Sequence, residues 1–306
     1  MDNAELIGLA KIHAAVKDPD VAHLVIGLNK VITSNTVPGL EVEVVEKSDE
    51  VRIGVYLKPE VRVAKPVHMC FGLVQEAGIQ KINLDLNIER DSAVDIIAHC
   101  VFPNATDVQH LMDAQINIAA NARYTYFERH IHSPAGGITV VPKAVVELGS
   151  GARFKTDFEL IQGRVGVIDI DYTTTCRDHS VMEMVAKVSG RGDDVIKIRE
   201  TGHLIGEYAR GALLSRVAVR DRARADVYNR LTASAAHARG HVDCKEIILD
   251  DGVASATPIV EVNHPKAHVT HEAALGSVDT KQLETLMSRG LSEDEASDLI
   301  VAGLLT

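Results

Sequence analysis

Hydrophobic and polar residues alternate along most of the chain from Glu41 onward. Every second side chain is apolar in three successive runs: Val42 and Val44; Val51, Ile53, Val55 and Leu57; Ile82, Leu84, Leu86 and Ile88. Such a period of two predicts half-buried β-strands, because successive side chains of a strand point to opposite faces. Further short strands are predicted at 138–146, 165–170, 195–198, 217–219, 247–249 and 259–262.

The first 38 residues follow a helical period instead. Apolar residues up to position 16 recur at helical intervals: Leu6, Leu9, Ala10, Ile12 and Val16. Asp18 and Pro19 then predict the start of a second helix, since Asp caps a helix and Pro suits its first turn. That helix is expected to run through Leu24, Ile26, Leu28 and Val31. Residues 1–38 are therefore predicted to form an N-terminal helical segment.

Two short helices with strong capping signals are predicted in residues 275–306. Asp279 with Gln282 forms a capping box, and Gly290 suits the left-handed position that ends a helix. Ser292 with Glu295 starts the second helix in the same way. The expected apolar positions are Leu283, Leu286 and Met287 in the first helix and Ala296, Leu299, Ile300 and Gly303 in the second. A tight turn at Arg289 to Leu291 joins them into a hairpin.

Many short strands separated by Gly, Asp and Asn breaks suit either a β-sandwich or a parallel β-solenoid. Strand spacing is irregular and no strict hexapeptide repeat is present, so periodicity leaves both folds open. Aromatic residues make up 4% of the chain and Trp is absent. Val, Ile, Leu and Ala dominate instead, which favours stacked aliphatic ladders and hence the solenoid.

Charge and composition exclude several functional classes. The net charge is −11 and no basic stripe is present, which argues against nucleic-acid and membrane-surface partners. No apolar run reaches the length of a membrane span, and the start MDNAELIG lacks a basic signal region. We therefore expect a cytoplasmic protein.

Sequence motifs of common enzymes are missing as well. There is no Walker A sequence, no H-E-x-x-H zinc motif and no G-x-S-x-G elbow, and residues 188–194 are interpreted as a turn between strands. The four cysteines lack C-x-x-C spacing, and Cys70, Cys100 and Cys176 are interpreted as small buried residues. One stretch gathers soft and borderline metal ligands within about thirty residues: Cys244, His264, His268, His271 and Glu272.

The same stretch carries a family resemblance. Residues 268–305 contain a His-Glu-Ala step, a Gly-Ser step, a Met-Ser-Arg-Gly-Leu turn, a Ser-Glu-x-Glu-Ala helix start and a final Ile-Val-x-Gly. This run resembles the C-terminal signature of the SufB/SufD family, the scaffold and adaptor subunits of iron–sulfur cluster assembly. The resemblance implies a right-handed parallel β-helix, here residues 39–274, with helical N- and C-terminal segments.

The resemblance also implies a set of cluster ligands. SufB scaffolds carry a cysteine at the place of Cys244, and His271 and Glu272 match two residues of the family's Glu-His-Glu step. Thr270 replaces the first carboxylate of that step, so this chain departs from the full pattern, and His268 is an additional candidate. The ligand set implies a transient iron–sulfur cluster of the four-iron type. Such mixed ligation holds a cluster weakly, which suits a scaffold that gives its cluster away.

Partners follow from the resemblance in the same way. The terminal hairpin is expected to dock a SufC-like ABC ATPase through Leu283, Leu286, Met287, Arg289, Gly290, Leu299 and Ile300, although its simpler role is a cap on a solenoid end. A short chain of this kind resembles a single-subunit form that pairs with itself as a homodimer through the β-helix. A cysteine desulfurase or other sulfur donor and apo-protein acceptors complete the expected partners. The family's second, deeper sulfur-accepting cysteine has no match at Cys176 by spacing.

Two other functions stay open at this stage. A SufD-like adaptor would shape the complex without holding the cluster, and its function would survive the loss of Cys244. A β-solenoid enzyme acting on glycans would need paired carboxylates on an exposed groove, for which no motif is present. The scaffold itself is not expected to be an enzyme, and the ATPase activity is expected in its partner.

Overall fold

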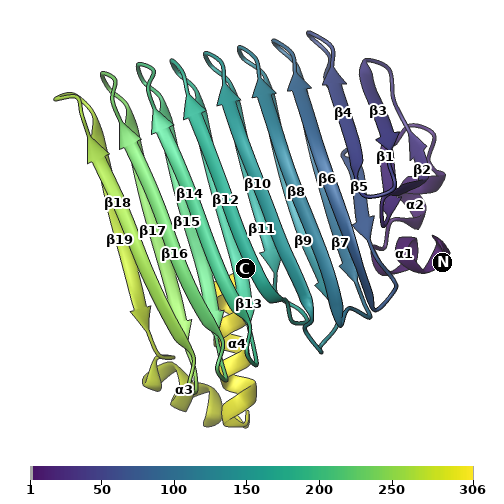
Figure 1. The fold of residues 1–306 in the computed structure, drawn as a ribbon. Coiled ribbons are helices and arrows are strands. Elements are labelled where there is room, and N and C mark those ends of the chain that lie inside the picture. Colours follow the sequence, from purple (N-terminus) through teal and green to yellow (C-terminus); the bar gives the residue numbers. More distant parts are fainter. Residues whose placement is uncertain (1–2, 306) are drawn as a thin grey trace.

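Residues 3–305, which the computed structural model describes, fold into a flattened β-solenoid (Figure 1). Two sheets of this part of the chain face each other, one of ten strands and one of nine. From β4 onward, successive strands alternate between the two sheets, and neighbours within each sheet are parallel. The mainly β solenoid predicted from the sequence is confirmed. Residues 1, 2 and 306 of the predicted terminal segments lie outside the described residues.

The ten-stranded sheet contains β1 (His23–Gly27), β2 (Lys30–Asn35), β5 (Val67–Gly72), β7 (Ala93–Phe102), β9 (Arg123–His132), β11 (Arg153–Leu160), β13 (Val181–Gly190), β15 (Arg210–Val219), β17 (Arg239–Ile248) and β19 (His268–Gly276). The nine-stranded sheet contains β3 (Leu40–Glu46), β4 (Val51–Leu57), β6 (Ala77–Ile88), β8 (Asp107–Ile118), β10 (Ile138–Leu148), β12 (Gly166–Cys176), β14 (Val195–Leu204), β16 (Arg224–Ala233) and β18 (Val253–Val262).

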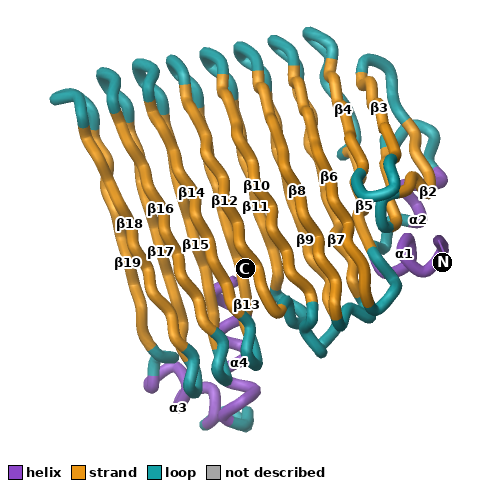
Figure 2. Tube along the Cα trace, viewed as in Figure 1, coloured by secondary structure: helices purple, strands orange, loops and turns teal. Residues whose placement is uncertain are grey.

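Each coil of the solenoid consists of two long strands and two tight turns. From β5 onward the register repeats after 28 to 30 residues, as between β12 and β14 and between β6 and β8. The turns stack in rows along the edges of the sheets (Figure 2). Asp91 and Asn121 occupy the same left-handed position in neighbouring turns, with φ of 60° and 59°, and Asn121 Nδ2 donates to Asp91 Oδ1 at 3.1 Å. This register brings residues about thirty positions apart next to each other.

Side chains that point between the two sheets form the core. Burial alternates strictly along strands such as β14, where every second residue is buried. The inward positions are mostly aliphatic, and they join the two sheets into one continuous cluster that runs through nearly every coil. Stacked aliphatic positions of this kind remove each strand's apolar face from water, which is the main source of stability for the solenoid.

The N-terminal region corrects one prediction. Helices α1 (Asn3–Leu9) and α2 (His13–Lys17) confirm the first helical period, but Asp18 ends α2 instead of starting a helix. The helix predicted from Leu24 to Val31 is wrong, because these residues form β1 and β2. All of β1 is buried, with Leu24 and Ile26 in the main core and Val25 under the N-terminal helices. Burial on both faces removes the alternation by which a strand is recognised.

The C-terminal hairpin agrees better with its sequence. Helix α3 (Thr280–Met287) is capped by Asp279, whose side chain accepts from Gln282 N, and Gly290 has φ of 98°. Helix α4 (Glu293–Leu305) starts with the predicted Ser292–Glu295 capping box. Its buried face differs from the prediction and consists of Ala296, Ser297, Val301 and Leu305. Within residues 3–305, no helix has the length and apolar character needed to span a membrane.

The two ends of the solenoid are finished differently. At the N-terminal end, antiparallel partners close both sheets, β2 beside β1 and β3 beside β4. At the other end, β18 and β19 are the last strands of their sheets, and each has a hydrogen-bonded neighbour on one side among the described residues. Helix α4 does not cover this end, because Val301 and Leu305 pack against Ala218 on β15. The C-terminal end therefore presents two open strand edges.

Candidate functional sites

Cys244 lies one coil from the open end, in the middle of β17. The strand begins at Arg239, earlier than the predicted start at 247, and turns the Cys244 side chain into the interior, where it is fully buried. Asn229 on β16 donates through Nδ2 to Cys244 Sγ at 3.7 Å, across the space between the sheets. Cys244 is thus a buried thiol in contact with a polar side chain.

Two buried carboxyl groups with raised pKa values, those of Glu246 and Glu200, lie near Cys244. Glu246 shares the inward parity of Cys244, and neither of its carboxylate oxygens has a hydrogen-bond partner. Burial raises the pKa of Glu246 to about 7, although Arg216 opposes the shift, and burial raises the pKa of Glu200 on β14 to about 8. Burial also raises the pKa of the Cys244 thiol, and the charges of Glu246 and Glu200 add to that effect.

His271 and Glu272 lie on β19, the edge strand beside β17. The register pairs His271 with Val242 and Glu272 with Asp243. Because paired residues of parallel strands share a face, His271 points to the same inner face as Cys244. The strand spacing and the rise per residue put their Cα atoms roughly 8 Å apart. Glu272 points to the outer face, beside Asp243. The strand therefore brings Cys244 and His271 together on one face and places Glu272 on the other.

His268 and Thr270 lie on the same edge strand. His268 and Thr270 alternate with His271 and share the outer face with Glu272. Thr270 Oγ1 lies 2.9 Å from His241 Nδ1, which places both on that face. All four residues are exposed, since no further coil covers β19. His268 is therefore no partner for Cys244 within a single chain.

The predicted docking residues divide into two groups. Leu283, Leu286 and Ile300 are partly buried between the two helices, and Leu286 and Ile300 line a groove of about 520 Å³. The remaining residues are exposed: Met287, Arg289, Gly290 and Leu299. Asp298 accepts from Arg220 Nη1 at 2.8 Å and so ties α4 to the turn after β15. The hairpin is anchored to the solenoid and still presents apolar side chains.

A second polar cluster, which the sequence did not predict, lies deep in the N-terminal half of the solenoid. Cys100 on β7 and Glu128 on β9 point inward and meet His110, which points inward from β8 in the opposite sheet. Cys100 Sγ lies 3.7 Å from His110 Nε2 and 3.4 Å from Glu128 Oε1. We call these three residues the Cys100 cluster. Among residues 3–305, these three side chains form the group of His, Cys, Asp and Glu residues that could hold a metal ion, with donor atoms within 4.8 Å of one another.

Hydrogen bonds extend from the Cys100 cluster in both directions. His110 Nδ1 donates to Gln80 Oε1 at 2.9 Å, and Gln80 Nε2 donates to the carbonyl of Leu28. On the other side, His130 Nε2 donates to Glu128 Oε1 at 2.8 Å. Burial raises the pKa of Glu128, but the hydrogen bond and charge of His130 outweigh it and hold that pKa below its ordinary value.

His130 and His132 continue this network. His132 Nδ1 lies 3.2 Å from the carbonyl of Arg164, which accepts, so His132 Nε2 is left as an acceptor for His130 Nδ1 at 3.0 Å. Burial lowers the pKa of His132 well below its ordinary value, which keeps that ring neutral. His130 thus joins His132 to the Glu128 carboxylate, and the three side chains form one buried network.

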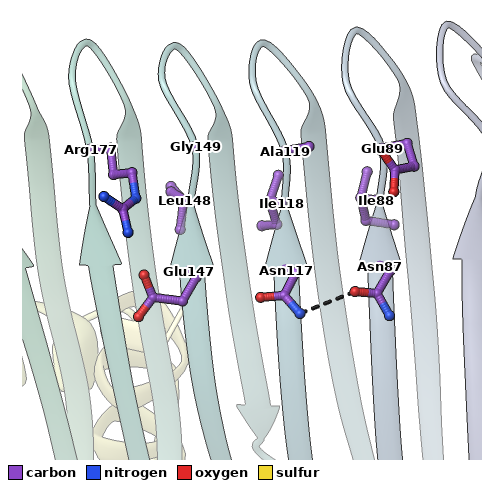
Figure 3. Close-up of a pocket in the computed structure, with 10 residues that line it drawn as sticks. All are labelled: Asn87, Ile88, Glu89, Asn117, Ile118, Ala119, Glu147, Leu148, Gly149 and Arg177. Carbon is purple, nitrogen blue, oxygen red and sulfur yellow. Dashed lines mark hydrogen bonds between the residues drawn. The ribbon is translucent and has the colours of Figure 1, made fainter.

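A surface depression of about 430 Å³ lies elsewhere, along the row of turns (Figure 3). Its residues come from corresponding positions of successive coils, and Asn117 Nδ2 donates to Asn87 Oδ1 at 3.1 Å. Neither a thiol nor an imidazole is among the residues that line it. The depression is thus separate from both cysteine clusters and offers none of the soft ligands that iron–sulfur chemistry needs.

The burial predicted for the three cysteines other than Cys244 is confirmed. Cys70, Cys100 and Cys176 are all buried and none forms a disulfide. Burial raises the pKa of Cys70 and of Cys176 to about 12, so both stay protonated. Cys100 differs from these two because it contacts a histidine and a carboxylate. A thirty-residue spacing between Gln80 and His110 is the sequence signal that could have predicted this cluster.

Comparisons with known proteins agree with the fold and with the C-terminal motif. The family model described as "SUF system FeS cluster assembly, SufBD core domain" matches residues 74–304. An iron–sulfur cluster assembly SufBD family protein of Methanocaldococcus jannaschii is 33% identical over 298 residues, which cover 96% of this chain and 94% of the relative. A SufBD family protein of Pyrococcus horikoshii is 33% identical over 285 residues, covering 93% and 87%.

A more distant relative shows the same family. The SufBD family protein of Archaeoglobus fulgidus is 25% identical over 248 residues, which cover 81% of this chain and 66% of the relative. The family model covers most of the solenoid as well as the C-terminal hairpin, so the resemblance extends well beyond the motif at residues 268–305. This chain belongs to the SufBD family of iron–sulfur cluster assembly proteins.

Proposed function

We propose that this chain is the scaffold on which an iron–sulfur cluster is assembled, and that it holds the cluster as cargo at the open end of the solenoid. The observation that supports this most directly is that Cys244 and His271 share the inner face of the last two coils. A thiolate and an imidazole are ligands that iron–sulfur clusters accept, and mixed ligation suits a cluster of the four-iron type that must be released.

A homodimer completes this site in the proposal. The edges of β18 and β19 are long and carry exposed apolar side chains, among them Leu275 at 49% and Val262 at 47% exposure. Open edges of this kind pair readily with another strand. A two-fold arrangement would place the same edge of each copy against the other. Ligands from both copies, including Glu272 from the outer face, would then surround a shared cluster.

Cluster binding requires the Cys244 thiol to lose its proton. Its raised pKa means that the thiol is protonated in the closed chain. Burial raises the pKa of Glu246 to about 7, so its carboxyl group can exchange a proton near neutral pH and is a candidate acceptor for the thiol proton. Metal binding then favours the thiolate, because the ligand form of cysteine is the deprotonated one.

The energy to open this end would come from an ABC-type ATPase of the SufC kind, which docks on the C-terminal hairpin. The groove beside Leu286 and Ile300 and the exposed side chains of Met287 and Leu299 offer an apolar surface for it. Because Asp298 and the buried face of α4 fix the hairpin to the coils around β15, a pull on α4 would reach the strands that carry Cys244. The chain itself is then a non-enzymatic cytoplasmic scaffold.

Anaerobic reconstitution tests the proposal. Wild type, Cys244→Ala and the matched control Cys176→Ala are incubated with iron and sulfide, with and without the ATPase, and bound iron, sulfide and visible absorption are measured. We expect a cluster in wild type and in Cys176→Ala, and its loss or rapid decay in Cys244→Ala. A cluster of equal stability in all three would contradict Cys244 as a ligand. No cluster in any of them would favour the SufD-like adaptor.

Docking has its own test. Met287→Asp and Leu299→Asp introduce charge on exposed positions of the hairpin, and Val45→Asp introduces it on an exposed apolar residue of β3 near the other end. Binding of the ATPase, measured by calorimetry, is expected to weaken about tenfold or more for the first two variants and to stay unchanged for the third. Unchanged binding in all three would overturn the hairpin as the docking surface.

A further inference from the structure

The Cys100 cluster has the donor set of a mononuclear metal site. It offers one thiol, one imidazole nitrogen and one carboxylate, contributed by three different strands and buried completely. These are the protein ligands of zinc, and ferrous iron accepts the same types. The cluster lies several coils away from Cys244, so it is separate from the proposed assembly site.

The distances between the donor atoms match the edges of a metal tetrahedron. With metal–sulfur bonds of about 2.3 Å and metal–nitrogen or metal–oxygen bonds of about 2.1 Å, tetrahedral angles put ligand atoms roughly 3.5 Å apart. Cys100 Sγ lies 3.7 Å from His110 Nε2 and 3.4 Å from Glu128 Oε1. Two of the three separations therefore match those that a bound ion requires, and all three donor atoms lie within 4.8 Å of one another.

The surrounding residues orient these donors as the outer shell of a metal site does. His110 donates from Nδ1 to Gln80, which leaves the Nε2 lone pair directed at Cys100. The Gln80 amide is itself fixed, because its nitrogen donates to a backbone carbonyl. His130 donates to Glu128, so the carboxylate is held as well. Such partners set the tautomer and orientation of metal ligands.

One carboxylate oxygen of Glu128 takes part in no hydrogen bond. Its Oε2 is buried and has no hydrogen-bond partner. A buried carboxylate oxygen without a partner is costly, and a metal ion would satisfy it. The three side chains thus supply three of the four positions of a tetrahedral site, because the two oxygens of one carboxylate are too close together to fill two of them.

We propose that Cys100, His110 and Glu128 bind a single divalent transition-metal ion, of the zinc or ferrous class, as a resident structural site. Aromatic rings enclose it: Phe102 lies 5.0 Å from the His110 ring and Phe158 lies 4.8 Å from the His130 ring, measured between centroids. Because the site is closed, the ion enters while the chain folds and exchanges slowly afterwards.

Cobalt serves as the probe, since thiolate-bound Co²⁺ absorbs in the near ultraviolet. The full chain is expressed in cobalt-supplemented medium, treated with a chelator and analysed for metal content and absorption. The variants are Cys100→Ser, Glu128→Gln, Cys244→Ala and, as a buried-cysteine control, Cys176→Ser. Circular dichroism and thermal unfolding establish that each variant is folded.

We expect one chelator-resistant ion per chain, with thiolate absorption, in wild type, Cys244→Ala and Cys176→Ser. Metal retention should fall about tenfold or more in Cys100→Ser and Glu128→Gln. Glu128→Gln keeps the side-chain shape, so it remains informative if Cys100→Ser does not fold. Folded wild type without chelator-resistant metal, or equal retention in Cys100→Ser and Glu128→Gln, would overturn the proposal.

Discussion

Two cysteines of this chain point into the same solenoid, yet their surroundings differ in what they permit. Cys100 is fully buried against His110 and Glu128, and each of these two is hydrogen-bonded to a further buried residue. Cys244 lies one coil from two open strand edges, beside carboxyl groups whose oxygens lack partners. The closed surroundings of Cys100 suit a permanently bound ion. The open surroundings of Cys244 suit an iron–sulfur cluster that is released.

The largest expected difference between the two regions is in stability. Phe158 is buried beside His130, whereas Leu275 on β19 is half exposed. Phe158→Ala should lower the free energy of unfolding by about 3 to 5 kcal/mol, and Leu275→Ala by about 0.5 kcal/mol or less. Urea unfolding followed by circular dichroism measures both. Similar losses for the two variants would mean that the open end is as tightly packed as the sealed region.

Thiol reactivity should separate the two cysteines next. Opening of the last coils exposes Cys244, while exposure of Cys100 requires the solenoid to unfold. If local opening costs about 3 kcal/mol less, iodoacetamide should modify Cys244 on the order of 100-fold faster. Mass spectrometry of peptides after timed labelling of dilute, metal-free protein gives both rates. Equal rates would indicate that the end does not open independently.

Buried carboxyl groups should give the two regions opposite pH dependence. Glu200 near Cys244 has a pKa raised to about 8 by burial, so its contribution to stability is lost as pH rises from about 4.5 to 8. Glu128 has a lowered pKa, so its contribution is present above about pH 4.5 and is lost as pH falls below it.

Two amide variants test these signs. Glu200→Gln should gain about 3 kcal/mol relative to wild type when pH is raised from 5 to 8. Glu128→Gln should be most destabilised relative to wild type at neutral pH and less so near pH 4. Urea unfolding of metal-free protein across this range provides the comparison. Parallel pH profiles for the two variants would contradict the difference in environment.

The smallest expected effect is confined to the hairpin beside the open end. Asp279 caps α3 through its side chain. Asp279→Ala should destabilise α3 by about 1 kcal/mol. Hydrogen exchange should then be about fivefold faster at the α3 amides, with β7 and β9 around Cys100 unchanged. Faster exchange in those strands as well would show that the hairpin stabilises the whole solenoid.

Local patterns in the sequence predicted much of this fold. Alternation indicated strands such as β4 and β6, and the capping residues Asp279 and Ser292 predicted where the last helices begin. The pattern failed at β1, because α1 and α2 cover the face that a half-buried strand would expose. The buried face of α4 was wrong for a related reason, since contact with β15 decides it.

The candidate sites depend on register, which no local pattern contains. Cys100 and Glu128 meet because the coil returns after 28 to 30 residues, and His110 reaches them from the opposite sheet. The family resemblance identified Cys244, His271 and Glu272 by position. It did not show that Glu272 lies on the opposite face from Cys244, which follows from the pairing of β17 with β19. Predicting these sites from the sequence would have required the register between successive coils.

We infer that the two cysteines hold different metals for different purposes. The decisive experiment measures the metal and sulfide content of Cys100→Ser and Cys244→Ser, each reconstituted anaerobically and then treated with a chelator. Cys244→Ser should lose sulfide and cluster iron but keep one resistant ion, whereas Cys100→Ser should lose the ion but still assemble a cluster. Loss of both in either folded variant would contradict two independent sites.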